Sequence, residues 1–138
     1  MEFGQINYLA ALVAAIASFA LGALWYSPVL FAKAWQRENK LTDDDLKNAN
    51  MAKIFGSTLV LTFVMAIGMA FLIQGHTTTD FNWHDGLHVG MLVGAFFIAA
   101  SMGINYLYQR KSFLLWAIDA GYQFLFLCLM GIILGAWH

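Results

Sequence analysis

Charge, cysteine, proline and catalytic motifs are all scarce in this sequence. Only 11% of its residues are charged, compared with about a quarter in an ordinary soluble domain, and a net charge of −1 argues against a basic face for nucleic acid. The single cysteine, Cys128, excludes an internal disulfide and a multi-cysteine metal site. No serine lies in a nucleophile motif, and the chain has neither a glycine-rich phosphate loop nor a catalytic pair of carboxylates. The sequence therefore predicts no enzymatic activity and no cofactor.

Hydrophobic residues, by contrast, make up 61% of the chain and are concentrated in long apolar stretches. A soluble chain of 138 residues cannot bury that much apolar surface, whereas a lipid bilayer accepts it as the exterior. Helices through these stretches are long enough to cross a hydrocarbon core of about 30 Å. The predicted spans are Ile6–Tyr26, Ile54–Ile73, Leu87–Leu107 and Phe113–Trp137. We therefore expect an all-α integral membrane four-helix bundle that forms a single domain over residues 1–138, with the lipid bilayer as its surroundings.

The positions of the basic residues predict how these spans are oriented. All seven Lys and Arg residues lie either in Lys33–Lys53 or at Arg110-Lys111. Basic residues near the ends of membrane helices stay on the cytoplasmic side. Both basic segments are therefore expected in the cytoplasm, and the two termini and the Gln74–Gly86 loop are expected to be extracytoplasmic.

The connection between the first two spans is expected to hold helices of its own. Ser27, followed by the only proline, Pro28, resembles an N-cap and a first helical residue. The short helix that follows is expected to lie on the membrane surface, with Lys33 and Arg37 reaching the headgroups. Thr42 and the three aspartates after it resemble a capping box. The helix that they start is expected to continue without a break into the second span.

Three segments of the sequence are distinctive: GALWYSPVLFAKAW at residues 22–35, Leu41–Asn50, and Asp119-Ala120-Gly121-Tyr122. Together they resemble a family of small four-span bacterial membrane proteins known only as a domain of unknown function. Its motif, GALWYSPxLFxKAW, includes Trp25, Tyr26, Ser27, Pro28 and Trp35. The resemblance covers essentially the whole chain and implies a multi-pass protein of the bacterial cytoplasmic (inner) membrane, without an established activity. Family members often have Gly in place of Ala32 and Asn in place of Asp119, which indicates that an amide often suffices at the second position.

Small residues recur at four-residue steps within the apolar stretches. The third span has Gly86, Gly90 and Gly94, and the fourth has Gly131 and Gly135. Such steps let helix backbones approach closely inside a membrane. They predict helix packing, either within one four-helix bundle or at an interface between subunits. Because several spans carry such steps, we expect a homo-oligomer.

Asp119 is the one ionisable side chain that the predicted spans place inside the bilayer. A carboxylate there costs about 2.5 to 3.5 kcal/mol even on lenient insertion scales, so it requires polar partners. Gln123 lies one turn further on the same helix face with Tyr122 alongside, and Asn105, near the end of the third span, is the expected partner. This polar intramembrane site either ties helices together through hydrogen bonds or belongs to a proton, ion or solute pathway.

The four histidines all fall on the predicted outer side. His84 and His88 are four residues apart and share a helix face, a spacing at which two imidazoles can chelate a transition metal. Such a site requires a third ligand, which Asp80 or His76 could supply. The alternative is an interfacial polar cap, in which Asp85 caps the third span.

These features leave three functions open. The first is an oligomeric permeation unit for ions, protons or a small solute, which uses the polar site around Asp119. The second is a structural or accessory membrane protein without transport activity. The third is an outer-face metal-binding membrane protein. The sequence identifies no small-molecule ligand, and the nearly pure apolar character of the outer halves of the spans counts against a continuous pathway.

Overall fold

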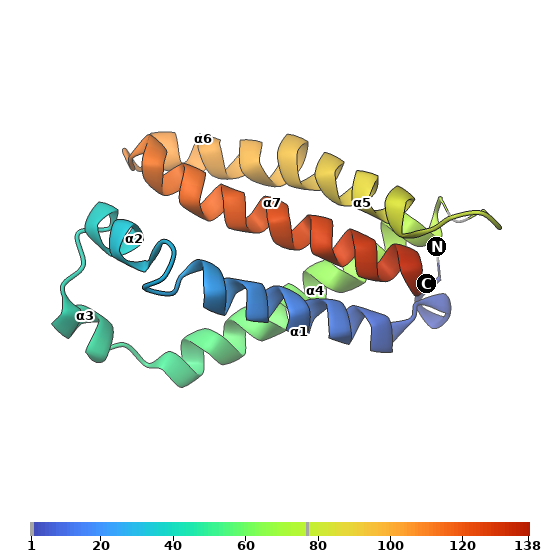
Figure 1. The fold of residues 1–138 in the computed structure, drawn as a ribbon, viewed down its shortest axis with the longest axis horizontal. Coiled ribbons are helices and arrows are strands. Elements are labelled where there is room, and N and C mark those ends of the chain that lie inside the picture. The colour runs from blue at the N-terminus through green and yellow to red at the C-terminus, as the bar shows by residue number, and fades with distance from the viewer. Residues whose placement is uncertain (1, 77) are drawn as a thin grey trace.

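The computed structural model describes residues 2–76 and 78–138. It contains four helical segments that are long and apolar enough to cross a membrane (Figure 1). These are α1 (Tyr8–Trp25), α4 (Met51–Gln74), the continuous segment Trp83–Tyr108, and α7 (Phe113–Ala136). A short 3-10 helix, η1 (Phe3–Gln5), precedes α1, and the described residues contain no strand. The predicted all-α class is therefore confirmed.

The third span is built from three parts: α5 (Trp83–Leu92), the π-helical segment η2 (Val93–Ala99) and α6 (Ala100–Tyr108). It begins at Trp83 rather than at the expected Leu87, because a capping box starts the helix earlier. The Asn82 side chain accepts from the backbone N–H of His84, and the Asp85 carboxylate accepts from the backbone N–H of Asn82. The first helical residues include His84 and Asp85, whose polarity excluded them from the predicted apolar stretch.

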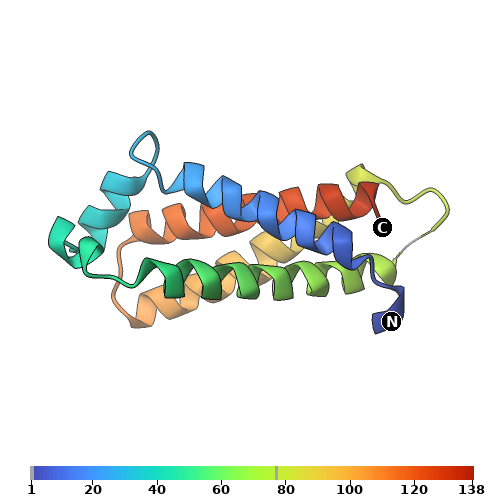
Figure 2. The same ribbon diagram turned by 90° about the horizontal axis from the view of Figure 1, so that it is seen from below.

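Helix α7 lies at the centre of the bundle. It contacts α1, α4, α5, η2 and α6 (Figure 1). Of its apolar stretch 56% is buried, compared with at most 28% in each of the other three spans. Helix α4 packs mainly on α1 and contacts α7 and α5 less extensively, so it occupies one side of the bundle (Figure 2).

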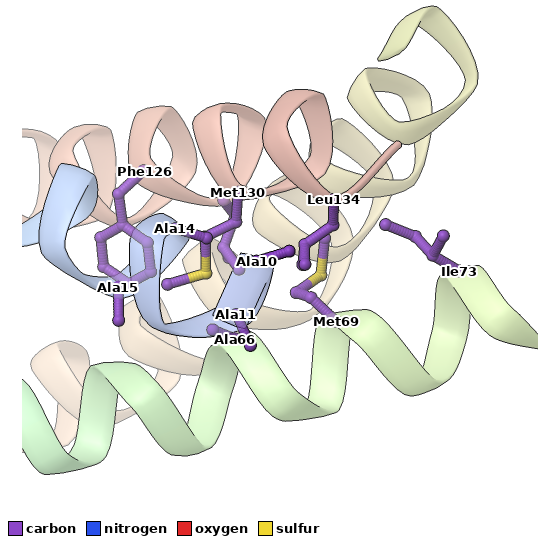
Figure 3. Packing of buried hydrophobic residues seen from close by; sticks show 11 residues of the cluster. Ala10, Ala11, Ala14, Ala15, Ala66, Met69, Ile73, Phe126, Met130 and Leu134 are labelled. Atoms are coloured by element: carbon purple, nitrogen blue, oxygen red, sulfur yellow. The ribbon is translucent and has the colours of Figure 1, made fainter. Parts of the chain in front are cut away.

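The core lies where α1, α4 and α7 meet, and its residues pair small side chains with large ones. Four alanines of α1 let the helices approach closely, and large side chains from α4 and α7 fill the space between the axes (Figure 3). The core residues are Ala10, Ala11, Ala14, Ala15, Ala66, Met69, Ile73, Phe126, Leu127, Met130 and Leu134. Large apolar side chains such as Phe96, which is 75% exposed, cover the outside of the bundle. Lipid accepts such an exterior.

Helices α5 and α7 approach each other backbone to backbone along the predicted glycine steps. A methyl group at Gly86 would overlap the carbonyl oxygen of Gly131, and one at Gly131 would overlap the carbonyl oxygen of Gly86. A methyl group at Gly90 would meet the backbone of Leu127 and Cys128, and Gly94 and Gly135 also abut the facing helix. We call this contact the glycine seam. The structure thus places these five glycines between helices of one chain rather than at a surface that a second chain could reach.

The two ends of the bundle differ in character. One end holds both ends of the described chain, together with residues 75–76 and 78–82 (Figures 1 and 2). The other end, which we call the basic end, holds α2 (Ala32–Glu38), α3 (Asp43–Lys47) and the turn between α6 and α7. All seven Lys and Arg residues belong to this end or, for Lys53, to the first turn of α4 beside it.

Two predictions for the basic end were wrong in detail. Helix α2 begins at Ala32 instead of Pro28, because the Ser27 hydroxyl donates to the Leu24 carbonyl and residues 27–31 form turns. The capping box of Thr42 and Asp45 is present, and the hydrogen bonds from the Thr42 backbone and side chain lower the pKa of the Asp45 carboxyl. However, α3 ends at Lys47, and α4 starts anew because the Asn50 side chain caps it through the backbone N–H of Lys53.

Candidate functional site

Asp119 lies at the junction of three helices, and both of its carboxylate oxygens are engaged. The Tyr26 hydroxyl donates to Oδ1 at 2.6 Å, and the Tyr106 hydroxyl donates to Oδ2 at 2.6 Å. Tyr26 follows the last residue of α1, Tyr106 lies in the last turns of α6, and Asp119 lies two turns into α7. One side chain therefore joins the basic ends of α1, α6 and α7. We call these three residues the Asp119 cluster.

The turn between α6 and α7 brings Tyr106 close to Asp119. Arg110 takes a left-handed conformation with φ of 58°, which reverses the chain direction, and Ser112 caps α7 by accepting from the backbone N–H of Leu115. The last turn of α6 and the first turns of α7 are thus held side by side. The short connection is what lets two residues only thirteen positions apart meet across two helices.

The π-helical segment turns Tyr106 toward α7. Gly86 faces α7, and Tyr106 follows it in the same span after five steps of four residues. In an α-helix each step of four residues rotates the side-chain direction by about 40° more than a full turn. In a purely α-helical span this drift would carry Tyr106 away from the α7-facing side. The wider turns of η2 reverse part of the drift, because a π-helix bonds five residues apart rather than four.

A second set of polar groups extends from the Asp119 cluster toward the middle of α1. The Tyr122 hydroxyl donates to the Ser18 carbonyl at 2.8 Å, and the buried Ser18 hydroxyl donates to the Ala14 carbonyl. Gly22 makes room for the Tyr122 hydroxyl, since a methyl group there would lie 2.7 Å from it. The Tyr122 ring also meets the Tyr26 ring edge to face at 5.4 Å. This polar series ends at Ser18, where the apolar core begins.

Two tryptophans bind backbone carbonyls beside the cluster. The Trp25 indole donates to the Ile118 carbonyl at 2.9 Å, and the Trp116 indole donates to the Ala99 carbonyl, at the end of η2, at 2.9 Å. Gly121 lies against the Trp25 ring. Trp35 of α2 meets the Tyr26 ring edge to face at 6.1 Å, so α2 covers the cluster from the basic end. The aromatic residues of the GALWYSPVLFAKAW segment and the Asp119–Tyr122 segment therefore converge at one place.

The structure corrects one partner in the predicted polar site. Tyr106, and not Asn105, is the residue of α6 that binds Asp119; Asn105 is exposed, because neighbouring residues of a helix point in directions about 100° apart. Gln123 is half-buried on α7, one turn beyond Asp119. The roles of Tyr26 and Tyr106 were not anticipated from the sequence, although the distinctive segment around Tyr26 was the available signal.

The histidine pair of α5 lies at the end of the bundle opposite the basic end. The rings of His84 and His88 pack edge to face with centroids 4.5 Å apart, and both side chains are exposed. Within residues 2–76 and 78–138, no group of three or more His, Cys, Asp or Glu side chains is placed to hold a metal ion. Asp85 instead completes the cap of α5. Metal binding at His84 and His88 stays a prediction.

The fold and the site together define a class: a small multi-pass α-helical membrane protein with a hydrogen-bonded polar cluster at one end of its bundle. Residues 9–135 match the family described as "Protein of unknown function (DUF1761)". The chain belongs to this family, which confirms the expected membership of an uncharacterised family. No curated protein and no solved structure matches the chain.

Proposed function

We propose that this chain is an accessory or structural membrane protein, without transport or enzymatic activity, in which the Asp119 cluster fastens α1, α6 and α7 together. The observation that carries this proposal is the complete engagement of Asp119. Each carboxylate oxygen accepts a tyrosine hydroxyl at 2.6 Å, from a different helix. A partly buried carboxyl group whose two oxygens each have a fixed hydrogen-bond partner on another segment is suited to holding helices together.

The packing above the cluster also supports this proposal. A conduction route requires polar groups or water at successive depths. Here the polar series ends at the buried Ser18, and beyond it the side chains of Phe126, Met130 and Leu134 fill the core. On the other side of α7, the glycine seam brings two backbones into contact. Neither region contains the polar groups at successive depths that a proton or a solute would require.

A second candidate function is permeation of protons, cations or a small solute. It is favoured by one observation: an ionisable group and three phenols lie together among apolar helices. In this alternative Asp119 exchanges its tyrosine partners for the permeating species, and a second copy of the chain completes the route.

A flux assay separates the two candidates. Vesicles containing the wild-type protein should show no proton or cation flux above protein-free vesicles, with an added ionophore verifying each gradient. Asp119→Asn should behave in the same way. Flux through the wild-type protein would contradict the accessory proposal, and loss of that flux in a still-folded Asp119→Asn variant would assign the route to Asp119.

We also propose that the chain resides in the bacterial cytoplasmic membrane with its basic end in the cytoplasm. The support is the collection of all seven basic residues at one end and of both termini at the other (Figures 1 and 2). Reporter fusions after His138 should therefore report an extracytoplasmic position, and fusions within 39–50 a cytoplasmic one. The opposite pattern would reverse the proposed orientation.

Homo-oligomerisation stays a prediction, and the residues that support it differ from those considered in the sequence. The glycines that first suggested it are engaged in the seam, whereas Gly56 and Gly68 of α4 face open space. A helix of a second copy could approach most closely at these two positions.

A further inference from the structure

A hollow lies on the surface of the basic end, between α2 and the turn that leads to α3. It has a volume of about 300 Å³ and is lined by Lys33, Gln36, Arg37, Leu41 and Asp43. The chain folds back to form it: Lys40 is left-handed with φ of 56°, and the backbone N–H of Leu41 donates to the Gln36 carbonyl. We call it the basic hollow.

The charges of the basic hollow suit an anion. Lys33 and Arg37 are four residues apart on α2, so they share one face, and both are exposed. Neither forms an ion pair within the part of the chain that the structure describes. The one acid of the lining, Asp43, is occupied by the Gln36 side chain, whose Nε2 donates to Oδ1 at 2.9 Å. The lining therefore has two basic side chains against one acidic side chain, and Arg37 offers the planar set of donors that matches phosphate oxygens.

The surroundings of the basic hollow indicate where the anion comes from. Only six residues separate the end of the membrane-spanning α1 at Trp25 from the start of α2 at Ala32. Within this connection Val29 is 82% exposed and Leu30 is 44% exposed. Exposed aliphatic side chains that precede two cations by a few residues in the sequence are typical of a segment at the boundary between headgroups and acyl chains.

We propose that the basic hollow binds the phosphate of an anionic phospholipid in the leaflet at this end of the bundle. Lys33 and Arg37 contact the phosphate, the Gln36 side chain binds one oxygen of Asp43, and the acyl chains extend past Val29 and Leu30. A free phosphate ion shares the headgroup chemistry but makes no use of the exposed aliphatic residues. This proposal is independent of whether the chain conducts ions.

Native mass spectrometry of the full chain in a neutral detergent tests the proposal, with dioleoyl phosphatidylglycerol as the anionic probe and dioleoyl phosphatidylcholine as the zwitterionic one. The wild type should bind phosphatidylglycerol in preference. The double variant Lys33→Gln/Arg37→Gln should lose affinity by a factor on the order of twenty, since each basic side chain near an anionic surface contributes about fivefold. The single variant Lys33→Gln should lose about fivefold, and it repeats the test if the double variant does not fold.

The matched control is Lys47→Gln/Lys53→Gln. It removes the same charge from the same segment, but neither residue lines the basic hollow. Its affinity for phosphatidylglycerol should stay within about twofold of the wild type. An equal loss in both double variants would show a diffuse electrostatic attraction and overturn the site. Equal binding of the two lipids, or displacement of the lipid by millimolar inorganic phosphate, would overturn the lipid assignment.

Discussion

Gly131→Ala is expected to destabilise the bundle by at least about 3 kcal/mol, at or above the upper end of the usual cost of overpacking. The new methyl group would overlap the carbonyl oxygen of Gly86. Its neighbour is backbone, so no side-chain rotation can relieve the overlap, and α5 and α7 must move apart. Because α7 is the central helix, this displacement also opens the core on its other side. The free energy of unfolding in mixed detergent micelles measures the effect, and Gly86→Ala should reproduce it.

Two exposed glycines of α4 serve as controls for this experiment. A methyl group at Gly56 or Gly68 of α4 meets no atom within 4 Å. Gly56→Ala and Gly68→Ala make the same chemical change and should be neutral or slightly stabilising, because alanine favours a helix more than glycine does. If Gly131→Ala proves as mild as these two, the glycine seam is not a close backbone contact. A loss of detergent-resistant oligomers in Gly68→Ala alone would assign α4 to a subunit interface.

Asp119→Leu is expected to lower the free energy of unfolding by about 2 kcal/mol, because it leaves the hydroxyls of Tyr26 and Tyr106 without their acceptor. Asp119→Asn should stay within about 0.5 kcal/mol of the wild type. The amide oxygen can accept from one phenol, and the amide nitrogen can donate to the other. The same micelle unfolding measurement compares the two variants directly.

A triple variant tests whether the cost arises from stranded hydroxyls. Tyr26→Phe and Tyr106→Phe remove both donors, so combining them with Asp119→Leu should recover most of the stability that Asp119→Leu loses. Replacing all partners of a buried hydrogen bond by apolar groups of similar shape is often nearly neutral. If the triple variant is instead less stable than Asp119→Leu alone, the tyrosines stabilise the bundle independently of the carboxylate, and the Asp119 cluster is not a helix tie.

The spans could be predicted from sequence because hydrocarbon thickness fixes their length. Each predicted stretch overlaps the observed helix, and the largest difference, at Trp83, arises where a capping box extends the helix into polar residues. The same reasoning placed Asp119 within the fourth span and predicted that it requires polar partners. The choice between Asn105 and Tyr106 as its partner did not follow from the sequence, because it depends on how far α6 is rotated.

That rotation depends on η2, which left no visible pattern in the sequence. The segment Val93–Ala99 is as apolar as its neighbours, and π turns differ from α turns only in their hydrogen-bond register. Similarly, Trp25 and Trp35 were distinctive in the sequence only as part of a motif. In the structure the Trp25 indole binds the Ile118 carbonyl beside the Asp119 cluster, and Trp35 covers the cluster. Side-chain hydrogen bonds between spans are set by helix rotation, and composition carries little information about that quantity.

The central position of α7 has a consequence for the biogenesis of the protein. Helices of a membrane protein enter the bilayer first and associate afterwards, and this chain emerges from the ribosome with α1 and α4 well ahead of α7. During that interval the alanine face of α1 can pack on α4, but Met69 and Ile73 still lack Phe126, Met130 and Leu134 as neighbours. The first two spans therefore stay incompletely packed in the membrane until α7 has been synthesised and inserted. A quality-control protease or an insertase that recognises loosely packed spans would meet this protein at that stage.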